Sequence, residues 1–343
     1  MQQFFHTDIP FKLESGEVLP AVTIAYHTWG RLNKNRDNVI WICHALTANS
    51  NVEDWWTGMI GEGSVFNSNE YFVVCANILG SCYGSTGPIS NDQNGNPYYH
   101  QFPFITIRDM VQAHERLRQH LNINQIFLLA GGSMGGYQVI EWSIMNAAQI
   151  QNLCLIATGA KESAWGIAIH TAQRMAIETD STWKEHHLQA GEKGLAVARA
   201  IGMLTYRNYK LFVDTQSEDT DDKVDSFKAS SYIMYHGSKL IKRFNAYSYW
   251  ILTRAMDAHN IARNRGDIRQ VLNSIQQPAL IIGIESDILC PVAEQEFLAD
   301  HIPSTKLKVI NSRYGHDGFL VETKQISDVI KHWLFAKDEM EKQ

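Results

Sequence analysis

The sequence predicts an α/β fold in which a mostly parallel, doubly wound sheet carries an inserted helical cap. Short runs of apolar and β-branched residues alternate with helical patterns along most of the chain, and this alternation is typical of a parallel sheet. Several of these runs are apolar on both faces, as expected for strands that helices cover on each side. Residues 161–269 contain no convincing strand, so we assign them to the cap and residues 1–160 and 270–343 to the core.

The hydrophobic period and the capping residues predict the individual elements. Thr106 and Asp109 have the spacing of a capping box, which predicts a helix that begins near residue 107. The predicted strands cover residues 22–26, 38–43, 71–76, 125–130, 153–157, 279–283 and 307–310. The other predicted helices cover residues 135–148, 164–178, 195–209, 230–259 and 326–335.

The composition indicates the broad class of protein. The chain has 343 residues, of which 45% are hydrophobic and 19% charged, with a net charge of −6, as in globular proteins. It has no basic stripe of the kind that nucleic-acid binding needs. The N-terminus shows no export signal, and the longest apolar runs are too short to cross a bilayer. The five cysteines are scattered, which favours free thiols. We therefore expect a cytoplasmic protein without a nucleic-acid or membrane partner.

The strongest chemical signal is the pattern G-x-S-x-G, which stands as GGSMG at residues 131–135. It directly follows one predicted strand and directly precedes a predicted helix. Such a sharp turn holds the serine above the sheet at a helix N-terminus, and the glycines avoid clashes there. A plain glycine-rich turn or a phosphate-binding loop is the alternative, but the Walker lysine and the G-x-G-x-x-G spacing are both missing. Ser133 is therefore the expected nucleophile of an α/β-hydrolase fold.

A serine nucleophile needs a base, and the base needs a carboxylate that orients it. In this fold the chain order is serine, then aspartate or glutamate, then histidine. Asp287 and His316 each follow a late predicted strand in that order, so we predict the triad Ser133, Asp287 and His316. Two alternatives stay open, because Glu285 is a rival orienting group and Asp287 could instead cap the following helix.

An oxyanion hole needs two backbone N–H groups that point at the tetrahedral intermediate. The residue after the nucleophile, Met134, is expected to supply one of them. The loop after the predicted strand 38–43 is expected to supply the other, and Leu46 is the candidate donor. The alternative is that this segment is an ordinary loop at the end of a strand.

Over most of its length the chain resembles the homoserine O-acetyltransferase family of α/β-hydrolases. The longest matching segment is also the most specific one, since the fold alone does not explain its glycine-rich pattern. The matching segments are HALT (44–47), ANILGSCYGSTGP (76–88), GGSMGG (131–136), EW (141–142), LTYR (204–207), SDILCP (286–291) and GHDGFL (315–320).

The resemblance implies a ping-pong acyl transfer of the kind used in methionine biosynthesis. Acetyl-CoA would acetylate Ser133, and homoserine or a related small hydroxy amino acid would then take the acetyl group. By the same resemblance, Arg207 would pair with the carboxylate of the acceptor and Asp317 with its ammonium group. Family members usually form homodimers through the cap. Acetyl-CoA is a co-substrate in this scheme, and neither a metal nor a bound cofactor is implied.

Two features leave an alternative function open. The chain departs from the family pattern at Asn51, Asn208, Asn245 and Asn260. The same triad would also serve a carboxylesterase that hydrolyses short-chain acyl esters, because water can discharge an acyl-enzyme in place of an alcohol. The choice between an acetyl and a succinyl donor is open as well.

Overall fold

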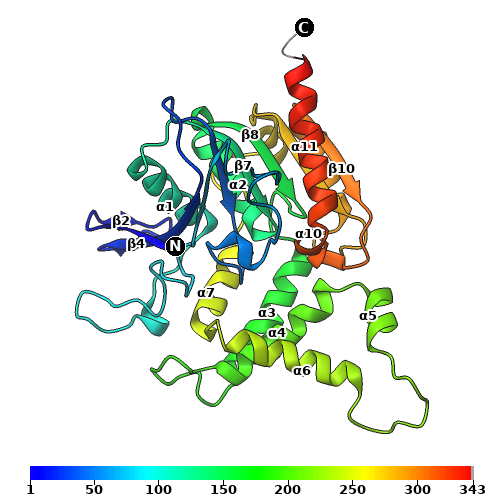
Figure 1. The fold of residues 1–343 in the computed structure, drawn as a ribbon. Coiled ribbons are helices and arrows are strands. Elements are labelled where there is room, and N and C mark those ends of the chain that lie inside the picture. The colour runs from blue at the N-terminus through cyan, green and yellow to red at the C-terminus, as the bar shows by residue number, and fades with distance from the viewer. Residues whose placement is uncertain (341–343) are drawn as a thin grey trace.

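The structure is a computed structural model that describes the backbone of residues 1–340 and the side chains of residues 1–334. The strands are β1 (Gln3–Thr7), β2 (Phe11–Lys12), β3 (Val18–Leu19), β4 (Val22–Trp29), β5 (Val39–Cys43), β6 (Phe72–Ala76), β7 (Ile126–Gly132), β8 (Ile150–Ile156), β9 (Ala279–Ile284) and β10 (Thr305–Ile310). Eight of them form one sheet in the order β1-β4-β6-β5-β7-β8-β9-β10, and β2 pairs with β3 (Figure 1). Only the β1–β4 and β4–β6 pairings of the large sheet are antiparallel. The predicted mostly parallel sheet is confirmed.

Apolar side chains pack on both faces of this sheet. Ile40, Trp41 and Ile42 follow one another in β5, and all three are fully buried. Trp41 belongs to one apolar core, whereas Ile40 and Ile42 belong to a second one. Because side chains alternate along a strand, the two cores lie on opposite faces, and the sheet is doubly wound as predicted.

Helices cover both of these cores. α1, α2 and α9 contribute apolar residues to the first core, and α11 contributes to the second. α1 begins at the predicted capping box, in which Thr106 and Asp109 exchange hydrogen bonds. Among the described residues no helix is long and apolar enough to span a bilayer. The helices of the core are α1 (Ile107–His120), α2 (Met134–Met145), α8 (Ile268–Asn273), α9 (Val292–His301), α10 (Gly318–Val321) and α11 (Thr323–Met340).

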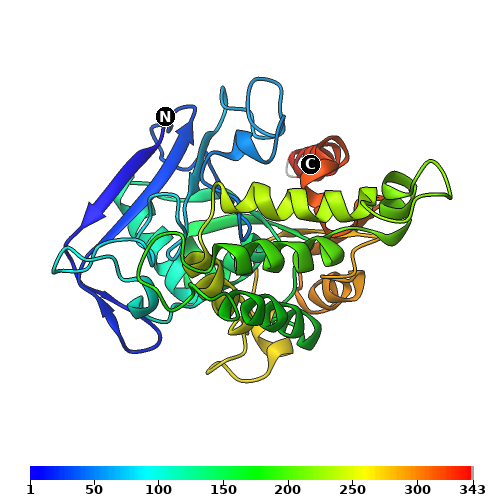
Figure 2. The ribbon, with the colours of Figure 1, turned by 90° about the horizontal axis from the view of Figure 1, so that it is seen from below.

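The cap is a set of helices that gathers on one side of the core. The helices are α3 (Ala164–Glu178), α4 (Glu192–Tyr206), α5 (Tyr209–Gln216), α6 (Lys228–Ile241) and α7 (Ala246–Asp257). α3, α4 and α6 lie side by side across the molecule (Figure 2). The outgoing and returning chains pair where they cross between core and cap. There Glu162 N donates to His259 O at 2.9 Å and Ile261 N donates to Ala160 O at 3.2 Å.

Two predicted cap helices were wrong in their extent. The single helix predicted over residues 230–259 is two helices, α6 and α7, because Asn245 caps the second one by accepting from Ser248 N at 2.8 Å. The helix predicted over residues 195–209 ends at Tyr206. A separate helix, α5, follows it, because the Asn208 side chain accepts from the N–H groups of the first turn of α5. In both places a polar side chain satisfies a free backbone N–H and starts a new helix.

A buried group of charges joins the N-terminal segment, two core helices and the chain that returns from the cap. Arg108 on α1 donates to Glu14 at 2.8 Å and to Glu141 on α2 at 3.1 Å. Its guanidinium also donates to backbone carbonyls within residues 260–263. Glu141 accepts a second bond, from Arg265, at 2.6 Å. Because the Glu141 side chain is only 1% exposed, the hydrogen bonds from these two guanidinium groups offset the cost of burying its carboxyl group.

We expect the substitution Glu141→Ala to lower the free energy of unfolding by about 3 kcal/mol, because it leaves the largely buried guanidinium of Arg265 without a carboxylate and that of Arg108 with Glu14 alone. Denaturation by urea measures this change. The matched control is Asp328→Ala, which breaks an exposed pair with Lys324 and should cost about 0.5 kcal/mol or less. Equal losses in the two variants would contradict the structural role of Glu141.

Candidate active site

Ser133 lies in the turn between the end of β7 and the start of α2. Its backbone has φ 55° and ψ −126°, a region that L-residues rarely occupy and that costs free energy. Contacts with the neighbouring strand hold this conformation. Ser133 N donates to Ile156 O at 2.9 Å, and the Thr158 hydroxyl donates to Ser133 O at 2.9 Å. The structure therefore fixes the serine at a strained corner, as the pattern G-x-S-x-G predicts.

The glycines of this turn are required by close packing of the backbone. A Cβ atom on Gly135 would lie 2.1 Å from the carbonyl oxygen of Cys43, at the end of β5. A Cβ atom on Gly131 would lie 2.5 Å from the carbonyl group of Gly135. Both distances are far below van der Waals contact, so no larger residue fits without moving the turn.

Ser133, His316 and Asp287 form one hydrogen-bonded chain. His316 Nε2 lies 2.8 Å from Ser133 Oγ, and His316 Nδ1 lies 2.6 Å from Asp287 Oδ2. The other oxygen of Asp287 accepts from the N–H groups of Leu289 and Cys290 at 2.8 and 2.9 Å, which fixes the carboxylate. The sequence predicted this convergence, because all three residues follow the carboxyl ends of strands in one sheet.

Glu285, the rival orienting group, points elsewhere. Its carboxylate accepts from the exposed side chain of Asn311 at 2.7 Å. The alternative that Asp287 caps the following helix is correct only in part. Asp287 Oδ1 does bind backbone N–H groups, but Oδ2 is the atom that contacts the imidazole. The chemical role of the triad stays a prediction, although its geometry is present.

The surroundings of His316 favour a strong base. Burial lowers the pKa of His316, but the charge and the hydrogen bond of Asp287, together with the charges of Asp317 and Glu162, outweigh this effect. The pKa therefore lies above the ordinary imidazole value. A neutral His316 can therefore take a proton from Ser133, and the resulting imidazolium is stabilised by Asp287.

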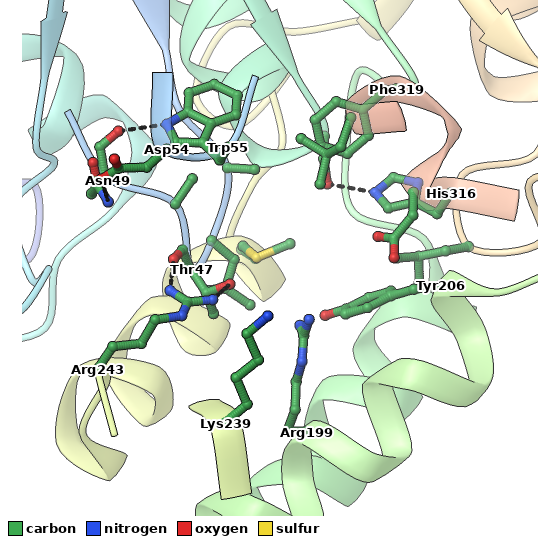
Figure 3. A pocket seen from close by; sticks show the side chains of 18 of the residues that line it. Thr47, Asn49, Asp54, Trp55, Arg199, Tyr206, Lys239, Arg243, His316 and Phe319 are labelled. Atoms are coloured by element: carbon green, nitrogen blue, oxygen red, sulfur yellow. Dashed lines mark hydrogen bonds between the residues drawn. The ribbon is translucent and has the colours of Figure 1, made fainter. Parts of the chain in front are cut away.

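A cavity of about 410 Å³ opens onto Ser133 and His316 (Figure 3). Leu46, one of the two predicted oxyanion donors, lines this cavity, and Met134 directly follows the nucleophile. Neither backbone N–H donates a hydrogen bond to another described residue. Both groups are therefore available to a developing oxyanion, and their role stays a prediction.

Arg207 and Asp317 lie together but face the cavity differently. Their side chains form an ion pair at 3.4 Å. Asp317 lines the cavity, whereas Arg207 is not among the described residues that line it. Burial raises the pKa of Asp317, and the nearby charges of Arg207, Arg199 and His316 oppose this rise. The predicted acceptor pair is thus located beside the nucleophile, with its aspartate exposed to the cavity.

Gly315 brings the histidine loop against the cap. It has φ +64°, and a Cβ atom there would lie 2.8 Å from Tyr206 O and 2.9 Å from the carbonyl carbon of Arg207. The end of α4 therefore packs directly on the loop that carries His316. This contact is the reason that Arg207, which is distant in sequence, lies next to Asp317.

The four asparagines that depart from the family pattern do not alter the cavity wall. None of them is among the described residues that line the cavity. Each makes a local hydrogen bond of a kind that caps a helix or closes a turn. The side chain of Asn51 donates to Asp54, and those of Asn208, Asn245 and Asn260 accept from the N–H groups of Lys210, Ser248 and Ala262.

Sequence reasoning missed the cap side chains that line the cavity. They are His170, Arg199, Tyr206, Lys239, Arg243 and Met256. Helical periodicity indicates which residues share a face of a helix, but it does not indicate that this face looks onto a cavity. One sequence signal near them was the matching LTYR segment, which contains Tyr206.

The fold and the serine site place the chain in a known class of enzymes. A family model described as "alpha/beta hydrolase fold" matches residues 38–323. A homoserine O-acetyltransferase from Cyclobacterium marinum is 47% identical over 331 residues, which cover 96% of this chain and 94% of that protein. The chain is thus an α/β-hydrolase. Within that class it belongs to the homoserine O-acetyltransferase family, and it is an O-acyltransferase.

Solved structures share this architecture. The homoserine O-acetyltransferase from Staphylococcus aureus is 27% identical with a TM-score of 0.81, and the match covers 97% of this chain and 95% of that one. Esterase E22 has a TM-score of 0.87 at 22% identity, and the match covers 97% of this chain and 99% of that one. Transferases and esterases thus share this fold, so the fold alone does not distinguish the two activities.

We expect Asp287→Asn to move the acid limb of the pH profile to lower pH. The base must be neutral, so wild-type kcat/KM for p-nitrophenyl acetate should fall as the pH drops through a His316 pKa above 6.5. Removing the Asp287 charge lowers that pKa and should reduce the rate by roughly 10³- to 10⁴-fold. Glu285→Gln is the control. If the acid limb of the pH profile moved equally in this variant, Asp287 would not be the residue that orients His316.

Proposed function

We propose that this enzyme transfers an acetyl group from acetyl-CoA to the hydroxyl of homoserine, or of a closely related small hydroxy amino acid. The observation that carries the proposal is the hydrogen-bonded chain from Ser133 through His316 to Asp287, which opens onto a cavity between core and cap. The relative from Cyclobacterium marinum, a homoserine O-acetyltransferase, matches this chain over nearly its whole length.

In the first half-reaction, Ser133 Oγ attacks the thioester carbonyl while His316 Nε2 takes the serine proton. The backbone N–H groups of Leu46 and Met134 stabilise the oxyanion that forms. The C–S bond then breaks, and the imidazolium returns its proton to the departing thiolate. The products are acetyl-Ser133 and free CoA.

In the second half-reaction, the acceptor hydroxyl attacks the acetyl ester and His316 takes the hydroxyl proton. The bond between the acetyl carbon and Ser133 Oγ breaks, and His316 returns the proton to the serine. These steps need neither a metal ion nor a bound prosthetic group. Asp287 stabilises the imidazolium through its hydrogen bond to His316 Nδ1.

The acceptor's charged groups match the pair beside the nucleophile. The carboxylate of an amino acid would displace Asp317 from the Arg207 guanidinium, which can bind a carboxylate through two parallel hydrogen bonds. Asp317 would then receive the ammonium group. The ion pair between Arg207 and Asp317 at 3.4 Å supports this proposal. An incoming zwitterion carries one charge of each sign, so it can replace Asp317 as the partner of Arg207 and Arg207 as the partner of Asp317.

Two further properties belong to this proposal. The cap exposes large apolar side chains on α4 and α6, among them Leu204 at 61% and Met234 at 63% exposure. Such a surface supports a homodimer that forms through the cap.

All five cysteines are free thiols, which supports a cytoplasmic location.

Hydrolysis of short acyl esters is the competing function, because water can discharge the same acetyl-serine. We expect release of the CoA thiol from acetyl-CoA to rise at least tenfold when homoserine is added. A thiol reagent follows this release, and p-nitrophenyl acetate cleavage is measured beside it. Ester cleavage without any homoserine-dependent release of CoA would favour the esterase. The variant Ser133→Ala should lose both activities.

We expect Arg207→Met to raise KM for homoserine at least tenfold, because a charge-assisted pair is worth about 1.5–3 kcal/mol. Pre-steady-state kinetics separates the two half-reactions. The rate of the acceptor half-reaction should fall more than the rate of the burst of CoA release. Arg313→Met is the control, since Arg313 is exposed and pairs with Asp214 on the surface. An unchanged KM for homoserine would remove Arg207 from the acceptor site.

A further inference from the structure

Three basic side chains of the cap converge on the cavity from the side opposite the triad. Arg199 lies on α4, Lys239 lies in the last turn of α6, and Arg243 follows the end of α6. All three line the cavity that contains Ser133. Figure 3 shows them side by side along the cap wall, whereas His316 lies across the cavity from Lys239 and Arg243.

None of these three cations forms an ion pair with a described carboxylate. Some other basic residues of the cap do: Arg174 pairs with Asp257, Lys223 pairs with Glu218, and Lys228 pairs with Asp219. Like charges that gather on one wall repel one another, and solvent screens this repulsion in part because Lys239 and Arg243 are exposed. The arrangement therefore fits a site whose counter-charge arrives with a ligand.

All three cations make contacts that leave their charge free. The Lys239 ammonium lies over the Tyr235 ring, 5.9 Å from its centroid. The Arg199 guanidinium lies over the Tyr206 ring, 5.3 Å from its centroid. Arg243 donates to the hydroxyl of Tyr83 at 2.6 Å and to the backbone carbonyl of Thr47, in the loop that carries Leu46. The cationic wall is thus connected to the same loop as the predicted oxyanion donor.

Two of the three cations, Arg199 and Lys239, also act on the neighbouring His236. Burial, together with the charges of Arg199, Arg207 and Lys239, lowers the pKa of His236 to about 4. This local positive potential stands out in a chain with a net charge of −6. A multiply charged anion would therefore be repelled by the protein in general and attracted to the mouth of this cavity.

We propose that Arg199, Lys239 and Arg243 bind the phosphate groups of the acyl donor while its thioester reaches Ser133. The inference rests on the proposed function and deepens it, because it assigns the donor's charged end to the cap. A simple acyl ester has no group that these cations would recognise. The cationic wall thus selects phosphate-bearing thioesters over neutral esters and supplies a physical basis for transferase specificity.

The test compares two thioester donors that share the reacting group. Acetyl-CoA carries phosphates, and S-acetylpantetheine carries none. For each variant, the ratio of kcat/KM for acetyl-CoA to kcat/KM for S-acetylpantetheine is measured with homoserine as acceptor. Because both donors are measured on the same preparation, any loss of folded protein cancels from the ratio.

We expect Lys239→Gln and Arg199→Gln each to lower this ratio at least fivefold, and added salt to lower it in the wild type. The control is Lys210→Gln, which removes one exposed cap charge outside the cavity. An unchanged ratio in Lys239→Gln and Arg199→Gln overturns the phosphate site but leaves acetyl transfer standing. An equal fall in Lys210→Gln also overturns it, since a general charge effect would then suffice.

If the wild type does not use acetyl-CoA at all, the proposed function fails and the phosphate site is judged separately. Free CoA is then tested as an inhibitor of p-nitrophenyl acetate cleavage, with pantetheine as the uncharged comparison. Inhibition by CoA that weakens at least fivefold in Lys239→Gln and Arg199→Gln supports the site. Inhibition that is equal in all variants, or absent from the wild type, overturns it.

Discussion

The hydrogen bond between Ser133 Oγ and His316 Nε2 is the contact on which the rest of the site depends. Residues 183 positions apart in the chain meet there at 2.8 Å. The meeting requires that Ser133 keep a backbone conformation that L-residues avoid, and the surrounding strands supply the free energy for it. Gly131 and Gly135 permit this turn, because larger residues would collide with neighbouring backbone. The core therefore acts as a rigid support for a single reactive oxygen.

In the proposed function, the cap determines which molecules reach that oxygen. Its α4 packs against the loop of His316 through Gly315, so the cap is in contact with the triad itself. The same helix carries Arg199, which lies on the cavity wall, and it ends directly before Arg207. In the proposed scheme, Arg199, Lys239 and Arg243 bind the donor's phosphates, and Arg207 binds the acceptor's carboxylate. By this proposal, transfer and hydrolysis share one core, and the charges of the cap distinguish between them.

The sequence predicted those parts of the fold that depend on local pattern. Strand periodicity, the capping box at Thr106 and the G-x-S-x-G pattern each act over a few residues, and chain order then placed Asp287 and His316 at the same edge of the sheet. It missed the break before Asn245, because the hydrophobic period continues across it and only the local cap of Asn245 marks the start of a new helix. It also did not indicate the direction of the Lys239 side chain. That direction depends on how the cap helices pack on one another and on the core, which no local period encodes.

The central claim is that Ser133 carries the acetyl group between donor and acceptor. Its most direct test is to mix the enzyme with acetyl-CoA in the absence of an acceptor, quench the mixture rapidly and map the peptides by mass spectrometry. The account predicts one added acetyl group, located on Ser133, which disappears when homoserine is added before the quench. An acetyl group on any other residue, or acetyl-homoserine formed by an enzyme that never becomes acetylated, would contradict it.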